Sequence, residues 1–453
     1  MTLPGRGIEW RPYQEDGIKA IMDMLKKERG AILGDDMGLG KTPQGAAVCS
    51  MLGQVTLIVC PAAVRHQWAT WAMRMGHAVA VLGPPSEKAF VSEWLAWKTR
   101  QVQWAIVSYN KMGDALKMRI PGTIAFDEPH NYLQGRGNTY VKQLWKYGGA
   151  ITYKLMLTGT PYLSKPAGLW QMFNILHGRK WGKARDFDVR YCNGHEGTWG
   201  WDNRGATNVP ELRARMATFM VRRMKAEVAK DLPKVTRTVR WVEGTKQATA
   251  ALARAQTTIV GMRGAVTATL PEKDKEVVAL LEEASSPTVV FTWQRVDADR
   301  LGAVLGKEGI EHMVIHGENT AAERARMVAA AHQLKCHVIT TYGSSGQGLD
   351  GLQHFCSNAV YHAIDPVPAI VLQASGRLDR IGQTLPVTET YLAMRDSVDE
   401  LTVDKVVNRL DTWASIMGAD KSTVEVRNAL AMSGIDVDND AVMAAIFADM
   451  TGE

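Results

Sequence analysis

The stretch GAILGDDMGLGKT, from Gly30 to Thr42, decides the fold class of this 453-residue chain. It begins with a short apolar run that suits a β-strand, and a glycine-rich turn then leads into a helical stretch. A strand, a glycine-rich turn and a helix in this order form a phosphate-binding loop, because backbone N–H groups and the start of the helix attract phosphate oxygens. The stretch therefore predicts a nucleotide-binding α/β domain.

Each residue type in the loop has a physical role. Gly38 and Gly40 let backbone N–H groups approach phosphate oxygens, Lys41 balances the β- and γ-phosphate charges, and the Thr42 hydroxyl can bind Mg²⁺. Asp35 stands where the general GxxxxGKT pattern has its first glycine, so the loop departs from that pattern at one position. The expected ligands are ATP and Mg²⁺.

A pair of carboxylates follows another apolar run in TIAFDEPH, residues 123–130. Asp127 is expected to hold the metal through water, and Glu128 to orient and polarise the attacking water. Taken alone, such a pair at the end of a strand is usually a solvated turn. The upstream phosphate loop is what favours a catalytic role.

Short β-rich runs alternate with helical stretches in two series, separated by a break. This alternation predicts two RecA-like lobes, each a parallel sheet flanked by helices, with helical insertions between them. We place lobe one at 1–240, lobe two at 241–412 and an acidic helical tail at 413–453. The intervening residues 165–286 have few strand-like runs and are expected to be mainly helical.

The segment QASGRLDRIGQ, residues 373–383, offers two cations one helical turn apart, Arg377 and Arg380. Hydrolysis needs positive charge on the transferring phosphoryl group, and both residues could supply it from lobe two as arginine fingers. Without the other motifs, an ordinary surface helix with two arginines would be the better interpretation.

Composition limits the remaining possibilities. Hydrophobic residues make up 46% of the chain and charged residues 22%, as in a globular protein with real cores. No apolar run approaches the roughly 18 residues of a membrane span and the start has no signal-peptide layout, so the expected location is the cytoplasm, of a bacterium or a phage-infected cell. The five cysteines are odd in number and far apart, and they indicate neither a disulfide framework nor a zinc site.

Charge is uneven along the chain. Residues 165–240 contain 16 Lys and Arg against 7 Asp and Glu, whereas the residues after Trp413 contain 2 against 7. A phosphate backbone would be attracted to the first segment and repelled by the tail. A solvated helical face with no partner explains the first segment about equally well.

These motifs, in this order, resemble the Swi/Snf-type DNA translocases of helicase superfamily 2, and the resemblance extends to about Arg409. It is carried by RPYQ, GDDMGLGKT, LIVCPAAVRHQW, IVSYN and LTGTP in lobe one, and by VVFTWQRVDADRL, IHGEN, TTYGSSGQGLDGL and QASGRLDRIGQ in lobe two. A narrower match to the branch with the annealing helicases, which rewind or remodel branched DNA, comes from RYC, WGWDNRGATN and ELRARMATFMVRRMKAEVAKDLP.

The resemblance implies roles for further residues. Gln14 would contact the adenine edge, and the LTGTP motif would couple hydrolysis to lobe movement. The implied nucleotide-binding residues are Arg11, Gln14, Asp36, Met37, Gly38, Leu39, Gly40, Lys41, Thr42, Gly348 and Asp350, and the implied coupling residues are His130, Thr158, Gly159, Thr160 and Gln373. The implied DNA contacts are Arg65, His66, Gln67, Trp68, Ser108, Tyr109, Arg222, Arg223, Trp293, Gln294, Arg295, His316, Thr340 and Ser344.

For several of these residues a structural role is the competing interpretation. Trp68 and Trp293 are each more often packing residues than platforms for bases, and packing of Trp199 and Trp201 is as good an explanation as a contact with forked DNA. Pro129 stands where the family usually has a small or polar residue, and proline should push Glu128 towards an extended backbone.

The expected function is an ATP-dependent translocase on double-stranded or branched DNA that contacts phosphates without reading sequence. Two alternatives remain open at this point. One is a helicase that separates strands of DNA or RNA, and the other is a nucleotide-gated binding module with weak hydrolysis.

Overall fold

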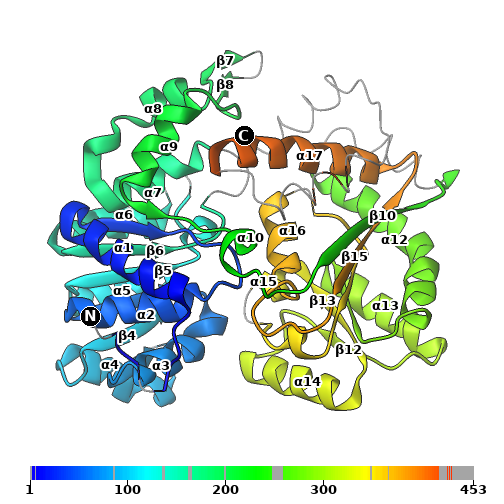
Figure 1. Ribbon diagram of the computed structural model, residues 1–453, viewed down its shortest axis with the longest axis horizontal. Coiled ribbons are helices and arrows are strands. Elements are labelled where there is room, and N and C mark those ends of the chain that lie inside the picture. Colours follow the sequence, from blue (N-terminus) through cyan, green and yellow to red (C-terminus); the bar gives the residue numbers. More distant parts are fainter. Residues whose placement is uncertain are drawn as a thin grey trace. The chain divides into compact units, whose positions relative to one another are not determined.

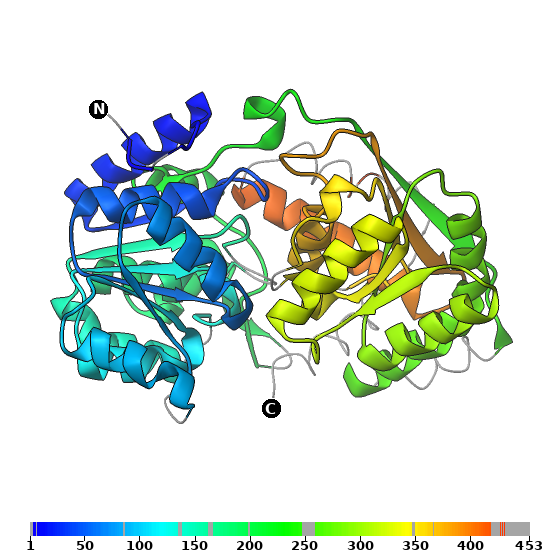
Figure 2. The same cartoon turned by 90° about the horizontal axis from the view of Figure 1, so that it is seen from below.

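The computed structural model describes residues 3–5, 7–84, 87–134, 138–161, 166–197, 200–246, 259–346, 349–365, 367–417, 426, 428 and 430. The chain divides into two compact units, Met1–Lys230 and Asp231–Glu453 (Figures 1 and 2). Each contains a parallel β-sheet with helices packed against it, so the predicted α/β architecture is confirmed. The boundary between the units along the chain falls between Lys230 and Asp231 rather than at residue 240. The strand that spans residue 240 pairs within the second sheet.

The first unit is built on a seven-stranded sheet in the order β3-β4-β2-β5-β6-β1-β9. All its pairings are parallel, and the burial of most strand residues accounts for the continuous apolar runs in the sequence. The strands are β1 (Gly30–Leu33), β2 (Thr56–Cys60), β3 (Val79–Leu82), β4 (Trp104–Ser108), β5 (Thr123–Asp127), β6 (Tyr153–Leu157) and β9 (Met220–Val221).

Helices surround this sheet. They are α1 (Pro12–Glu28), α2 (Lys41–Leu52), α3 (Arg65–Arg74), α4 (Val91–Lys98), α5 (Met112–Met118), α6 (Thr139–Tyr147), α7 (Gly168–His177), α8 (Ala184–Tyr191), α9 (Val209–Ala217) and α10 (Lys225–Val228). One core cluster joins Ile18 of α1 and Val48 of α2 to Leu33, Ile58 and Leu157 of the strands. The helix that follows the phosphate loop is thereby fixed to the sheet through fully buried side chains.

The second unit has a six-stranded sheet in the order β10-β15-β14-β11-β13-β12, also parallel throughout. Its strands are β10 (Val235–Val242), β11 (Thr288–Thr292), β12 (His312–Ile315), β13 (His337–Thr341), β14 (Asn358–Tyr361) and β15 (Val387–Met394). Its helices are α12 (Ile259–Glu282), α13 (Arg295–Lys307), α14 (Ala321–Leu334), α15 (Tyr342–Gly346), α16 (Pro368–Ser375) and α17 (Val398–Met417).

The stretch 165–286 is less helical than the sequence suggested. It contains α7–α10 and α12, but also β9, β10 and an antiparallel hairpin of β7 (His195–Gly197) and β8 (Gly200–Asp202). The alternating burial of VTRTVRWV, residues 235–242, is the two-residue period of a strand, and it was available in the sequence. The predicted tail from residue 413 lies mostly outside the described residues.

No helix within the described parts of the chain is long and apolar enough to cross a membrane. The five cysteines are buried and unpaired, as the sequence indicated.

Candidate nucleotide site

The predicted phosphate loop connects β1 to α2 in the first unit. Gly38 and Gly40 have φ values of 84° and 77°, in the left-handed region that favours glycine. A Cβ on Gly159 would lie 3.2 Å from both the Asp35 carbonyl oxygen and the Lys41 Nζ, so the LTGTP segment closely approaches the loop. The structure thus places the loop and LTGTP against each other, as the order of motifs predicted.

Lys41 begins α2 and its ammonium is bound by carbonyl groups. The Nζ donates to the Asp35 and Asp36 carbonyl oxygens at 2.9 and 3.3 Å. Burial lowers the pKa of Lys41, while the charges of Glu128, Asp35, Asp36 and Asp127 act in the opposite direction. A cation in contact with dipoles rather than with a carboxylate can exchange those dipoles for phosphate oxygens.

The carboxylate pair lies at the carboxyl end of β5, where the sequence placed it. Asp127 is the last residue of the strand, and its Oδ2 accepts a 2.7 Å hydrogen bond from the Trp68 indole N–H. Burial and the neighbouring Glu128 charge raise the pKa of Asp127 to about 7. A divalent cation would reverse that shift, because it favours the ionised carboxylate. The donor set of Asp127 and the Thr42 hydroxyl therefore fits Mg²⁺.

Glu128 does not have the extended backbone that Pro129 led us to expect. Its φ and ψ are 50° and 53°, in the left-handed region, and its N–H donates to the Leu157 carbonyl oxygen at 2.9 Å. This bond to the end of β6 and the short 3₁₀ turn that starts at Pro129 together fix an uncommon conformation. The strain is local to the residue expected to orient water.

The predicted coupling residues of the first unit lie close together, whereas Gln373 belongs to the second unit. His130 is buried, and its Nδ1 lies 2.8 Å from the Thr158 Oγ1 and 3.3 Å from the Glu128 Oε2. The Thr160 N–H donates to the Thr158 Oγ1 at 3.1 Å. Burial and the charge of Lys41 lower the pKa of His130 to about 3, so the ring is neutral. Close polar contacts through His130 therefore connect Glu128 to LTGTP.

Two arginines that the sequence assigned to DNA lie at the base of the phosphate loop instead. Arg222 donates to the Gly34 and Gly159 carbonyl oxygens, each at 3.0 Å. Arg223 forms two hydrogen bonds to the fully buried Asp35 carboxylate and one of 2.8 Å to the Gln44 Oε1. These contacts favour a role in positioning the loop over a role in binding DNA. No local pattern in the sequence indicates them, because the partners are 188 residues apart.

The start of α1 also lies beside the loop. The Gln14 Nε2 and the Tyr13 hydroxyl donate to the Leu39 carbonyl oxygen at 3.2 and 3.1 Å, and the Gln14 Oε1 accepts from the Arg11 N–H at 3.2 Å. Gln14 is thus close enough to the loop for the predicted adenine contact, which stays a prediction. Tyr13 was not among the predicted residues.

In the second unit, both predicted arginine fingers bind one carboxylate. Arg380 forms an ion pair with Asp350, and the Arg377 guanidinium lies 3.9 Å from the same side chain. The sequence suggested that the two arginines lie on a helix. They do not, because α16 ends at Ser375 and turns follow. Gln373 lies on α16, and Gly348 lies outside the described residues.

Several predicted DNA contacts are exposed and others are not. His66, Gln67, Gln294 and Arg295 are exposed, whereas Arg65, Ser108, Trp293 and His316 are partly buried. Trp68 is fully buried in the core, and Tyr109 is buried with its hydroxyl donating to the Asp127 carbonyl oxygen at 2.9 Å, so both are corrected from DNA contacts to structural neighbours of the carboxylate pair. Thr340 and Ser344 are also buried.

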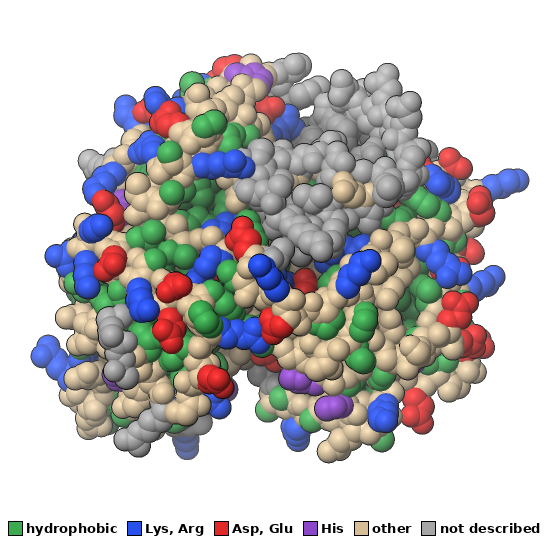
Figure 3. Space-filling model, viewed as in Figure 1, with side chains coloured by type: hydrophobic (Ala, Val, Ile, Leu, Met, Phe, Trp, Pro, Cys, Tyr) green, Lys and Arg blue, Asp and Glu red, His purple; other side chains and the backbone are tan. Residues whose placement is uncertain are grey.

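The basic segment of the sequence is neutralised in part by ion pairs on the folded surface. Figure 3 shows acidic and basic side chains interspersed over α8, α9 and the hairpin. Arg190 pairs with Glu211, Arg204 with Asp202 and Arg185 with Glu196, while the Trp201 indole donates to buried Asp188 at 2.9 Å. Trp201 therefore has a structural partner, and Trp199 lies outside the described residues.

The phosphate loop lies between β1 and α2, the carboxylate pair lies at the end of β5, two positions away in the sheet, and Gly159 of LTGTP approaches the loop. Together these features define a nucleotide hydrolase of the phosphate-loop class. The model of the SNF2-related domain family matches residues 13–282. The chain belongs to this family, and the resemblance inferred from the motifs is confirmed.

The chain is similar to several named proteins. It is 26% identical over 414 residues to the SWI/SNF-related matrix-associated actin-dependent regulator of chromatin subfamily A-like protein 1 of Xenopus laevis, covering 86% of this chain and 42% of the relative. It is 24% identical over 450 residues to the DNA annealing helicase and endonuclease ZRANB3 of Homo sapiens, covering 91% and 41%. The chain thus spans less than half the length of these two relatives.

Among solved structures, the chain is similar to the Sulfolobus solfataricus SWI2/SNF2 ATPase core in complex with dsDNA. The identity is 21%, the TM-score is 0.46, and the match covers 95% of this chain and 98% of that one. The description of the fold rests on the two sheets themselves rather than on this likeness.

Proposed function

We propose that the chain is an ATP-driven motor that tracks the phosphate backbone of double-stranded DNA without reading its base sequence. The observation that carries the proposal is the Lys41 ammonium, bound to two loop carbonyls beside Asp127 and Glu128, in a chain of the SNF2-related domain family. The two relatives named above add support, since one is called a regulator of chromatin and the other a DNA annealing helicase.

Residues of the first unit bind and orient the nucleotide in this proposal. Lys41 exchanges its carbonyl partners for β- and γ-phosphate oxygens, and Arg223 keeps Asp35 and the loop in place while it does so. Glu128 accepts a hydrogen bond from the attacking water and orients it. Bound Mg²⁺, held by Asp127 and Thr42, would neutralise charge on the phosphate oxygens.

The second unit supplies cations for the transition state. The Asp350 carboxylate pairs with Arg380 and lies 3.9 Å from Arg377, and both guanidiniums can leave it for the more highly charged γ-phosphate. Breaking a partly exposed pair with Asp350 costs little compared with the gain of a phosphate contact.

The finer proposal is that the motor remodels or anneals branched DNA, or displaces bound protein. It rests on the similarity to the annealing helicase and on the phosphate-directed, sequence-independent contacts expected of such motors.

A turnover assay tests the proposal. Phosphate release is measured with linear duplex, forked duplex, single-stranded DNA, RNA and no nucleic acid. Duplex should stimulate turnover at least about 10-fold, and Lys41→Ala and Glu128→Gln should each lower it by about 10²-fold or more, since each removes charge stabilisation or general-base assistance. Lys117→Ala is the matched control, because Lys117 lies exposed on α5.

Other outcomes separate the alternatives. Equal turnover without nucleic acid would contradict the motor. Negligible turnover with tight, ATP-dependent DNA binding would indicate the nucleotide-gated module. Triplex displacement along intact duplex supports translocation, whereas release of one strand of a plain duplex would indicate a strand-separating helicase. Equal stimulation by fork and linear duplex at limiting concentration would remove the branched-DNA part of the proposal.

A further inference from the structure

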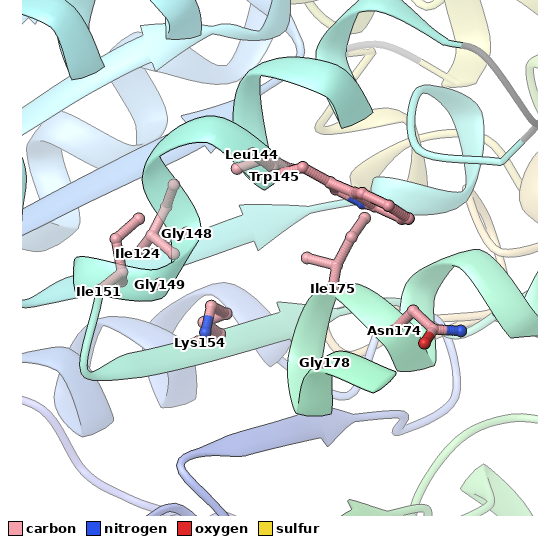
Figure 4. A pocket seen from close by; sticks show the side chains of 10 residues that line it. All are labelled: Ile124, Leu144, Trp145, Gly148, Gly149, Ile151, Lys154, Asn174, Ile175 and Gly178. Carbon is pink, nitrogen blue, oxygen red and sulfur yellow. The ribbon is translucent and has the colours of Figure 1, made fainter. Parts of the chain in front are cut away.

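The first unit has a cavity of about 320 Å³ near the ends of β5 and β6 that are opposite the nucleotide site (Figure 4). Ile124 lies near the amino end of β5, whereas Asp127 lies at its carboxyl end. At about 3.3 Å per residue these two positions are roughly 10 Å apart along the strand. The cavity is therefore a separate place, with none of the predicted nucleotide residues in its lining.

Apolar side chains form most of the lining. Ile124, Leu144, Ile151 and Ile175 are each less than 10% exposed, and they come from β5, α6, the approach to β6 and α7. Trp145, the next residue of α6, is 60% exposed and extends its indole over Ile175 (Figure 4). A large exposed aromatic side chain beside an apolar cavity presents a flat surface that a ligand could cover.

One edge of the cavity has no side chains to fill it. Gly148 and Gly149 form this edge, in the 3₁₀ turn that follows α6. A Cβ on Gly149 would meet nothing within 4 Å, and one on Gly148 would lie 3.8 Å from the Lys154 Cε. The edge is open enough to admit a ligand to the side chain of Lys154.

Lys154 is the only cation in the lining, and the remaining polar side chain is Asn174. Lys154 belongs to β6, and its backbone N–H donates to the Arg29 carbonyl oxygen. Across the described ranges, the Lys154 ammonium has neither a hydrogen bond nor an ion pair. Burial lowers the pKa of Lys154. A partly desolvated ammonium with no counter-charge favours the arrival of an anion.

Asn174 adds a second polar contact. Its Nδ2 donates to the Trp170 carbonyl oxygen at 2.9 Å, which fixes the amide on α7. A few oriented polar groups on apolar walls, in a volume of about 300 to 1,000 Å³, are the usual features of a small-molecule site.

We propose that this cavity binds a small aromatic carboxylate, with its ring packed between Trp145 and Ile175 and its anion paired with Lys154. The size follows from comparison with an engineered apolar cavity of about 150 Å³, which takes up one benzene ring. A volume about twice as large accommodates two fused rings with a short acidic group. Such a ligand pairs with the Lys154 ammonium and also covers the exposed indole of Trp145.

The experiment is a calorimetric titration of the full chain with naphthalene-2-carboxylate and with its neutral carboxamide. The carboxylate should bind one saturable site at least about 10-fold more tightly than the amide, because only the anion pairs with Lys154. Lys154→Met should abolish that preference while leaving amide binding unchanged, and Lys154→Arg should retain it. Trp145→Ala should weaken both probes about 10-fold.

Lys117→Met is the control, since Lys117 is 63% exposed on α5, outside the cavity lining. The proposal is overturned if neither probe saturates up to millimolar concentration. It is also overturned if Lys154→Met and Trp145→Ala both leave the affinity for the carboxylate unchanged, or if Lys117→Met weakens binding of the carboxylate as much as Lys154→Met does. The titration needs no nucleotide or DNA, so its result is independent of the proposed motor activity.

Discussion

Trp68 in the first unit donates its indole N–H to Asp127 over 2.7 Å, and Trp293 in the second unit makes the same kind of bond to Asp365 over 2.7 Å. In both units the tryptophan follows one strand and the aspartate ends or follows its parallel neighbour: β2 and β5 in the first unit, β11 and β14 in the second. The same local arrangement therefore occurs at corresponding edges of two different sheets.

The charges around the two arrangements differ. In the first unit the Lys41 ammonium contacts carbonyl oxygens while several carboxylates lie nearby. In the second unit two buried cations are paired directly with carboxylates, Arg237 with Glu389 and Lys273 with Asp399. Direct pairing stabilises a fold, whereas a cation bound only by dipoles can accept a ligand. The comparison separates a binding site from structural ion pairs.

The largest expected effect concerns a structural pair of the second unit. Arg237 and Glu389 have side chains 2% and 0% exposed, so Arg237→Met leaves an uncompensated buried charge and should lower the free energy of unfolding by about 3–5 kcal/mol. Guanidinium unfolding followed by circular dichroism measures this. In the first unit, Lys41→Met should change the same quantity by less than about 1 kcal/mol, because its ammonium has no ion pair among the described residues.

The double variant Arg237→Met with Glu389→Gln is the control for that prediction. It removes the buried negative charge and keeps one acceptor oxygen for either the Tyr361 or the Tyr391 hydroxyl, so it should recover part of the loss. A loss below about 1 kcal/mol in Arg237→Met alone would show that pairing in the second unit contributes little.

The next effect compares the two tryptophans directly. Trp68→Phe and Trp293→Phe each remove a hydrogen bond to a carboxylate, and each should cost about 1.5–3 kcal/mol of stability. Only Trp68→Phe should also raise the Mg²⁺ concentration needed for half-maximal turnover, by about 10-fold, because the indole orients a metal-binding carboxylate. Equal Mg²⁺ requirements in the two variants would mean that Asp127 is no more a metal ligand than Asp365.

The smallest effect is a pH dependence in the first unit. The pKa of His130 is lowered to about 3 by burial, so below its ordinary value near 6.5 the unfolded chain binds a proton that the folded chain does not. The contribution of neutral His130 to the free energy of unfolding is thus fully present above about pH 6.5. It falls on acidification by about 1.4 kcal/mol per pH unit. His130→Gln should reduce the difference in the free energy of unfolding between pH 6.5 and pH 5.5. An unchanged pH dependence of this free energy would contradict the lowered pKa of His130.

The sequence predicted most of what lies within a single motif. The apolar runs at 31–33, 56–60, 123–126 and 153–157 became strands because continuous apolar residues suit a sheet covered on both faces. Lys41, Asp127 and LTGTP came together because the carboxyl ends of parallel strands lie on one edge of the sheet.

Contacts between segments that are far apart in the sequence could not be predicted from local motifs. Arg222 and Arg223 looked like members of a basic DNA-binding segment, and only the pairing of β9 with β1 reveals that they reach the loop. Packing was the favoured interpretation of Trp68, but its hydrogen bond to Asp127 joins residues 59 positions apart and has no local signal in the sequence. The alternating strand β10 could have been recognised from VTRTVRWV, and the end of α16 before Arg377 depended on turns with no decisive local signal.

We expect the first unit to bind the nucleotide and the second unit to supply cations for its hydrolysis. Equilibrium binding of a fluorescent ATP analogue, measured beside turnover in Lys41→Ala, Arg377→Ala and Arg380→Ala, tests this most directly. The account predicts that Lys41→Ala loses nucleotide affinity, while both arginine variants keep affinity within about 3-fold and lose turnover by about 10³-fold. Normal binding in Lys41→Ala, or normal turnover in both arginine variants, would contradict it.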